Sequence, residues 1–63
     1  MQNNLAAIRY QQNLSLRDLS ARSGVSRSHI TKIETGERTP TVPTAYALCR
    51  ALKYSIYDVF PDV

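Results

Sequence analysis

The sequence of 63 residues holds one cysteine, one histidine and no tryptophan. A single cysteine cannot form an intramolecular disulfide, and a structural zinc site needs four ligands that are usually cysteine or histidine. Cys49 and His29 therefore cannot build a zinc site, and we expect neither a metal nor a cofactor. We expect Cys49 to be a small buried hydrophobic residue in a reducing compartment.

Long apolar runs are missing as well. No stretch of the sequence approaches the roughly 18 residues that a membrane span requires. The segment Met1–Asn4 has neither the basic start nor the apolar stretch of a signal peptide. We therefore expect a cytoplasmic protein that does not contact a membrane.

A chain of this length forms one domain at most, which we expect to span residues 1–63. Small chains bury only about 60% of their unfolded surface, so there is no room for a separate substrate cleft. The sequence also has no glycine-rich phosphate loop, no pair of carboxylates at catalytic spacing and no nucleophile–base set. We therefore expect no enzymatic activity and no small-molecule ligand.

The basic residues are concentrated in the first two thirds of the chain. Residues 1–42 hold six basic and three acidic residues, whereas residues 43–63 hold two of each, so the net charge of +3 belongs to the first part. This asymmetry favours a surface that binds a polyanion. A generally solvated surface explains so small an excess equally well.

Capping residues, glycines and prolines divide the chain into five short segments in which apolar residues recur at helical spacing. A serine followed three residues later by aspartate, the spacing of a capping box, occurs at 15–18 and 55–58. Ser26 and Thr41 are further expected N-caps. No segment alternates apolar and polar residues for the length of a strand, so we expect an all-α fold. The expected apolar face of the fourth helix consists of Val42, Ala45, Leu48, Cys49 and Leu52.

The segment 14–40 contains two of these short helices, joined by the turn Ser23–Val25. Gly24 stands where the chain must reverse, and Ile30 and Ile33 direct one face of the second helix to the core. This is the physical description of a helix-turn-helix, in which the second helix offers a polar face to a DNA major groove. The outer face of that helix carries Arg27, Ser28, Thr31 and Lys32.

The sequence resembles the lambda-repressor/Cro-type (XRE-like) helix-turn-helix family of DNA-binding proteins. The resemblance covers nearly the whole chain, from about Leu5 to Phe60, and continues into the last two helices. A lone Gly-Val-Ser would mean little, whereas a dozen positions in register are a specific signal. The matching residues are Leu14, Ser15, Leu19, Gly24, Val25, Ser26, Ile30, Ile33, Glu34, Gly36, Arg38 and Pro40.

The resemblance implies a compact five-helix lambda-repressor-like domain, with the helix-turn-helix formed by its second and third helices. It also implies a sequence-specific transcriptional regulator, which we expect to be a repressor. Such a protein would bind double-stranded DNA as a homodimer on a pseudo-palindromic operator, with residues 27–34 as the recognition helix in the major groove.

Two groups of residues are candidates for DNA contact. Arg27 leads the first group because its guanidinium suits the O6 and N7 atoms of guanine, although a phosphate contact or plain solvation is the alternative. The candidates for base contact are Arg27, Ser28, Thr31 and Lys32, and the candidates for phosphate contact are Arg17, Ser26, Thr35, Arg38 and Thr39.

The chain departs from the family pattern at a few positions. Many family members begin the second helix with a glutamine that binds phosphate, whereas this chain has Leu16 followed by Arg17. We therefore expect Arg17 or nearby backbone N–H groups to hold a phosphate there. Asn13 and Lys53 stand where glycine often ends a helix, and a lysine is less suited than asparagine to a left-handed conformation.

Family members often pair an arginine of the first helix with the glutamate that closes the recognition helix. Arg9 and Glu34 occupy those positions, and we expect them to form a structural ion pair. Loss of DNA binding after a change of Arg9 would then report a disturbed fold as readily as a lost contact.

The last third of the chain is neutral and rich in aromatic and aliphatic residues. The resemblance implies a two-fold dimer contact in this region, with Tyr54, Ile56, Tyr57 and Val59 as candidates. In a monomer the same residues would be ordinary core and surface. A second function also stays open, namely an antitoxin-like or other protein-interaction module built on the same fold.

Overall fold

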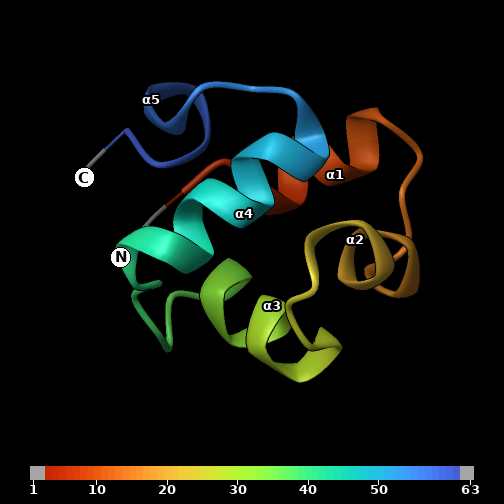
Figure 1. Ribbon diagram of the computed structural model, residues 1–63, viewed down its shortest axis with the longest axis horizontal. Coiled ribbons are helices and arrows are strands. Elements are labelled where there is room, and N and C mark those ends of the chain that lie inside the picture. Colours follow the sequence, from red (N-terminus) through yellow and green to blue (C-terminus); the bar gives the residue numbers. More distant parts are fainter. Residues whose placement is uncertain (1–2, 62–63) are drawn as a thin grey trace.

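The computed structural model describes residues 3–61, which form five helices with no strand among them (Figure 1). The helices are α1 (Leu5–Gln11), α2 (Leu16–Ser23), α3 (Arg27–Glu34), α4 (Val42–Leu52) and α5 (Ile56–Val59). The expected all-α class with five helices is confirmed. Residues 1–2 and 62–63 of the expected single domain lie outside the described residues. No helix within residues 3–61 is both long and apolar enough to cross a membrane.

Helices α2 to α5 each begin at a hydroxyl N-cap, as the sequence predicts. The Asp18 N–H donates to Ser15 Oγ at 3.0 Å and the Ser15 N–H donates to the Asp18 carboxylate at 3.1 Å, which completes a capping box. Residues 55–58 repeat the box, and Ser26 and Thr41 cap α3 and α4. The hydrogen bond from the Ser15 backbone lowers the pKa of Asp18. These caps satisfy N–H groups that have no partner inside helices too short to be stable alone.

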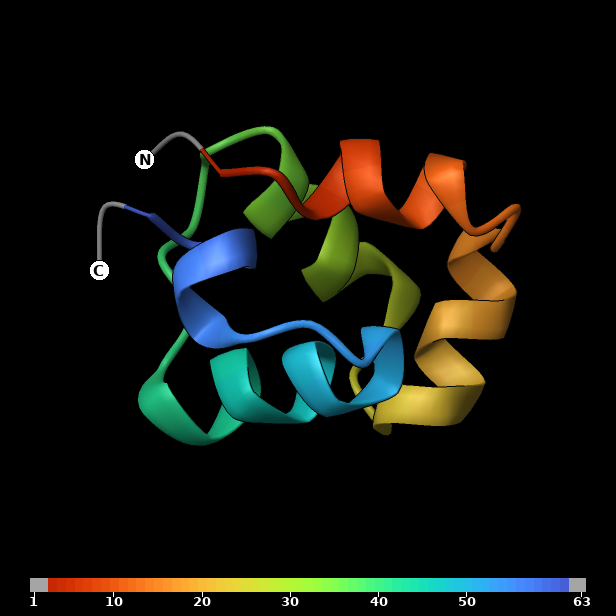
Figure 2. The ribbon, with the colours of Figure 1, turned by 90° about the horizontal axis from the view of Figure 1, so that it is seen from above.

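The helices pack around one hydrophobic core. Helix α2 packs against α3 and α4, α5 packs against α4, and α1 packs against α3. Figure 2 shows α1 and α4 along opposite sides of the molecule, with α2 at one end and α5 at the other. The buried hydrophobic residues are Leu5, Ile8, Leu14, Leu19, Val25, Ile30, Ile33, Ala45, Leu48, Cys49, Leu52, Val59 and Phe60.

Two expectations about α4 have opposite outcomes. Cys49 is buried, as expected, and this burial raises the pKa of its thiol, which keeps the unreactive protonated form. Val42 was expected on the buried face but is 63% exposed. The core covers α4 only from Ala45 onward, so the first turn of the helix projects beyond it.

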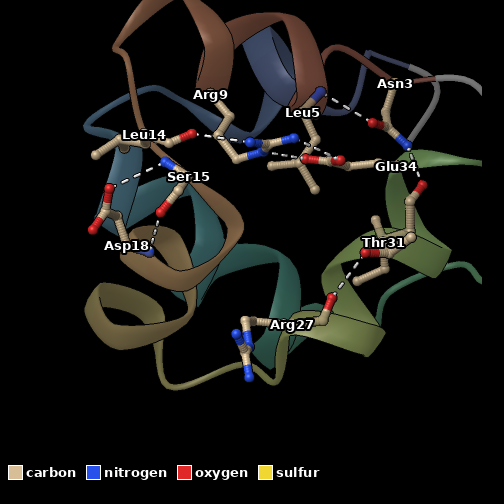
Figure 3. A network of polar contacts seen from close by, with 10 residues as sticks. Asn3, Leu5, Arg9, Leu14, Ser15, Asp18, Arg27, Thr31 and Glu34 are labelled. Atoms are coloured by element: carbon tan, nitrogen blue, oxygen red, sulfur yellow. Dashed lines mark hydrogen bonds and ion pairs between the residues drawn. The ribbon is translucent and has the colours of Figure 1, made fainter.

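A network centred on Arg9 holds the C-terminal end of α3 (Figure 3). Arg9 Nε donates to Glu34 Oε2 at 2.7 Å, and Nη2 donates to Oε1 at 3.2 Å. Arg9 Nη1 donates to the backbone oxygen of Leu14 at 2.9 Å. The guanidinium also lies over the ring of Tyr10, 4.5 Å from its centroid. The hydrogen bond to Glu34 is the main reason that the pKa of Arg9 is raised.

This network joins α1, the residue before the α2 cap and the last residue of α3. Arg9 is only 5% exposed, so water competes weakly for its donors. Within residues 3–61 every buried side-chain nitrogen and oxygen has a hydrogen-bond partner. The buried charge is therefore fully matched, which is the condition under which such a pair is tolerated in a core.

Left-handed residues end several of the helices. Gly24 and Gly36 have φ angles of 78° and 85°, and the non-glycine residues Asn13 and Lys53 have φ angles of 57° and 61°. Asn13 thus adopts the left-handed conformation expected of it, and Lys53 adopts it too, although lysine is less suited to it. Asparagine tolerates this region, whereas a lysine side chain adds a steric cost of about 1–2 kcal/mol.

We predict that Lys53→Gly stabilises the protein by about 0.5–1 kcal/mol. The change relieves the left-handed strain but removes a cation near the C-terminus of α4, which is worth about 0.3–1 kcal/mol. Urea unfolding followed by circular dichroism measures the difference. Asn13→Gly is the control and should change stability by less than about 0.5 kcal/mol. An equal gain in both variants would show that strain at Lys53 is not the cause.

Arg9→Ala is expected to destabilise the fold by about 3–5 kcal/mol, because the largely buried Glu34 carboxylate, whose side chain is 10% exposed, loses its partner. Changing both Arg9 and Glu34 to methionine should recover much of this loss, although the Leu14 carbonyl still lacks a donor. Small domains have total stabilities near this size, so unfolding is followed in trimethylamine oxide, which keeps the starting state folded. If Arg9→Ala proved as stable as the wild type, the structural role of the pair would be contradicted.

Candidate nucleic-acid interface

Helix α3 is oriented by the tight turn that precedes it. Gly24 adopts the left-handed conformation, and the Val25 N–H donates to Ser23 Oγ at 3.2 Å while that hydroxyl donates to the Leu19 carbonyl at 2.7 Å. Ile30 and Ile33 are fully buried. The opposite face of α3 is therefore turned to solvent, and it is there that the structure places Arg27, Ser28, Thr31 and Lys32, all exposed.

Arg27 stands at the first position of α3, and its side chain extends away from the core (Figure 3). Within residues 3–61 no hydrogen bond or ion pair engages its guanidinium. All of its N–H donors are therefore available to an external acceptor. A guanidinium can present two parallel N–H groups, the arrangement that matches one edge of guanine.

The hydroxyl groups near α3 differ in what they can offer a ligand. Thr31 Oγ1 donates to the Arg27 carbonyl and Thr35 Oγ1 donates to the Lys32 carbonyl, both at 3.1 Å. Ser26 Oγ instead accepts the His29 N–H at 3.2 Å, so its own proton is uncommitted by that cap. Ser26 is thus better prepared than Thr35 to donate to a phosphate oxygen.

A hollow of about 180 Å³ opens between α3 and the loop that follows it, lined by Ser28, His29, Lys32 and Arg38. The loop returns to the helix because Gly36 is left-handed and the Arg38 N–H donates to the Lys32 carbonyl at 3.1 Å. Sequence reasoning placed Lys32 with the base contacts and Arg38 with the phosphate contacts, whereas the structure brings both to one hollow. His29, which also lines the hollow, is not among the residues that the sequence offers as DNA contacts. The sequence feature that could have predicted this arrangement is Gly36, because its left-handed conformation turns the loop back toward α3.

The start of α2 is less favourable to an anion. Arg17 is exposed there, but the ionised Asp18 of the capping box lies in the same helical turn. The Asp18 carboxylate is ionised at neutral pH and repels a phosphate. Hydrogen bonding to Ser15 lowers its pKa further below the ordinary value. Thr39, the remaining candidate for phosphate contact, is exposed in the loop before α4.

The residues expected at a dimer interface differ in their exposure to solvent. Tyr57 is 76% exposed and Tyr54 is 36% exposed, whereas Ile56 is half-buried against the core. Val59 is fully buried and offers no surface to a partner, so it is corrected from an interface candidate to a core residue. The single turn of α5 directs Val59 inward because it must cover α4. Tyr46 is half exposed on α4 and was not among the candidates.

Residues 5–59 match the family described as Helix-turn-helix. An uncharacterized HTH-type transcriptional regulator of Sinorhizobium fredii is 40% identical over 52 residues, which are 82% of this chain and 68% of that protein. A second from the same organism is 44% identical over 52 residues but is covered over only 26% of its length. An uncharacterized HTH-type transcriptional regulator of Methanocaldococcus jannaschii is 35% identical over 60 residues and is covered over 91% of its length.

The match of the family over five helices, the exposed polar face of α3 and the names of the relatives agree with one another. The chain therefore belongs to the XRE-type helix-turn-helix family of DNA-binding transcriptional regulators.

Proposed function

We propose that the protein represses transcription by binding a specific pseudo-palindromic operator as a homodimer, with α3 as the recognition helix in the major groove. The observation that carries this proposal is the polar, exposed face of α3 opposite the buried Ile30 and Ile33. A helix held by a core on one side and unengaged on the other is the arrangement that reads base edges. A small domain blocks the polymerase without any further contact where its operator overlaps the site that the polymerase occupies.

The exposed face of α3 and the adjacent hollow have separate roles in this proposal. Arg27, Ser28 and Thr31 contact base edges, with the Arg27 guanidinium directed at a guanine. Lys32 and Arg38 instead act together on one phosphate, which their shared hollow would receive. Contacts of the first kind give sequence preference, whereas those of the second kind fix the position of the domain on the duplex.

The homodimer is proposed to form through the exposed aromatic side chains of the last third of the chain. Tyr54 and Tyr57 provide accessible apolar surface with a polar tip, a combination enriched at protein interfaces. A two-fold dimer presents two copies of α3 to half-sites about one helical turn apart, which explains why the operator should be a pseudo-palindrome.

A selection from a random double-stranded DNA pool tests the operator. We expect a palindromic winner that the protein binds at least about a thousandfold more tightly than scrambled duplex. Arg27→Ala should relax the preference at one symmetric pair of positions, because only that side chain reads them. Titrations at two salt concentrations check that phosphate neutralisation supplies much of the affinity. Equally weak binding to every duplex would contradict the proposed sequence-specific function.

A double-mutant cycle tests the shared phosphate. Lys32→Ala and Arg38→Ala should each weaken binding to operator and scrambled duplex alike, and their effects should be coupled by at least about 0.5 kcal/mol. Arg50→Ala, which removes an exposed cation outside the hollow, is the control, and its effect should not be coupled to that of Lys32→Ala or of Arg38→Ala. A repeated selection with Lys32→Ala that relaxes one base position would instead make Lys32 a base reader.

A protein-interaction module is the second candidate function, and the exposed aromatic surface favours it. Tyr46 and Tyr57 are at least half exposed, and tyrosine is enriched at protein–protein interfaces. A protein partner would cover them as well as a second copy does. Analytical ultracentrifugation separates these cases, because a homodimer requires self-association of the purified chain.

A further inference from the structure

The segment before α1 holds the end of α3 at a second point, besides the contact that Arg9 of α1 makes. Asn3 Nδ2 donates to the backbone oxygen of Ile33 at 2.9 Å, across 30 residues of sequence (Figure 3). The same amide accepts the Leu5 N–H through Oδ1 at 3.0 Å. One side chain thus satisfies an N–H at the start of α1, where helical N–H groups lack partners. It also donates to a carbonyl at the end of α3 that accepts the Gly36 N–H as well, at 3.1 Å.

The two attachments differ in what they constrain. The ion pair holds α3 through the side chain of Glu34, which can change its torsion angles, whereas Asn3 holds the backbone itself at Ile33. The packed side chains of Ile30 and Ile33 already hold one face of α3 against the core. The two polar contacts, one to the Ile33 backbone and one to the Glu34 side chain, resist the smaller rotations about the helix axis that core packing leaves.

Such rotation matters for the exposed face of α3. Side chains reach about 5–6 Å from a helix axis, so a rotation of about 15° moves their tips by about 1.4 Å. Hydrogen bonds to base edges tolerate only a few tenths of an ångström, and functional groups need positions accurate to about 0.5 Å. Phosphate contacts by long flexible cations tolerate far more.

We propose that Asn3 is a positioning residue for DNA recognition, whose amide sets the rotation of α3 and thereby the discrimination between operator and other DNA. This inference rests on the proposed function. It assigns specificity to a residue outside the helix-turn-helix, through a contact between the segment before α1 and the backbone of α3.

The neighbouring residue provides a matched control. Asn4 Nδ2 donates to the Asp58 backbone oxygen at 2.9 Å, and the Asn4 N–H donates to the Val59 backbone oxygen at 2.9 Å. Asn4 therefore holds the same segment of the chain, but to α5 rather than to α3. Asn3→Asp and Asn4→Asp add the same charge one residue apart, and each removes one side-chain donor to a backbone carbonyl.

The experiment compares binding of both variants to the selected operator and to scrambled duplex. Asn3→Asp keeps the acceptor for the Leu5 N–H, and the Ile33 carbonyl keeps the Gly36 N–H, so we expect the variant to stay folded. It should lower the operator-to-scrambled affinity ratio about tenfold. Asn4→Asp should leave this ratio within about twofold, although its charge weakens all DNA binding to the same degree. Urea unfolding confirms that each variant is folded under the binding conditions.

The outcomes separate this inference from the function on which it rests. If the wild type discriminates and Asn3→Asp discriminates equally well, the positioning role is wrong and the proposed function stands. If both variants lose discrimination equally, the effect comes from the added charge or the loosened segment, and the role of Asn3 is again wrong. If the wild type itself does not discriminate, the proposed function fails and the inference fails with it.

Discussion

The guanidinium of Arg9 is the group on which the placement of α3 depends. It is buried, and it donates to the Glu34 carboxylate and to the Leu14 carbonyl, so that α1, the approach to α2 and the end of α3 meet at one side chain. A buried cation is unfavourable unless all its donors are matched, and this requirement makes the arrangement specific. Positions of α3 that fail to satisfy Arg9 are disfavoured, because each would leave a buried charge without a partner.

The rest of the fold compensates for the shortness of the helices. Helices of four to eleven residues are unstable alone, and here serine and threonine caps begin four of the five. The ends of the described chain are also joined, since the Asn4 N–H donates to the Val59 carbonyl. Local capping and a few long-range hydrogen bonds thus support a core that is small for lack of chain length.

The surface of α3 and its loop combines two kinds of polar group. At the start of the helix, Arg27 has uncommitted donors in a fixed fork, which suits recognition of one chemical pattern. Further along the helix, Lys32 shares a hollow with Arg38. Two cations beside one cavity favour a phosphate group, and a phosphate contact does not depend on the base sequence. At the start of α2, by contrast, the capping box includes the charged Asp18, so the carboxylate that stabilises the helix start also disfavours an anion there.

Much of this protein was determined by the sequence itself, namely the helices, their caps, the turn at Gly24 and the exposed face of α3. These features depend on residues three or four apart, so their physical causes lie within a short window of sequence. The Arg9–Glu34 pair was expected only through resemblance to a family, because 25 residues separate its partners. Tertiary structure alone decided that Val59 is core, that Val42 is exposed, that Lys32 and Arg38 share a hollow and that Asn3 reaches Ile33. The reason is that these outcomes depend on how the helices pack against one another, and residue spacing within one helix carries no information about the neighbour that covers it.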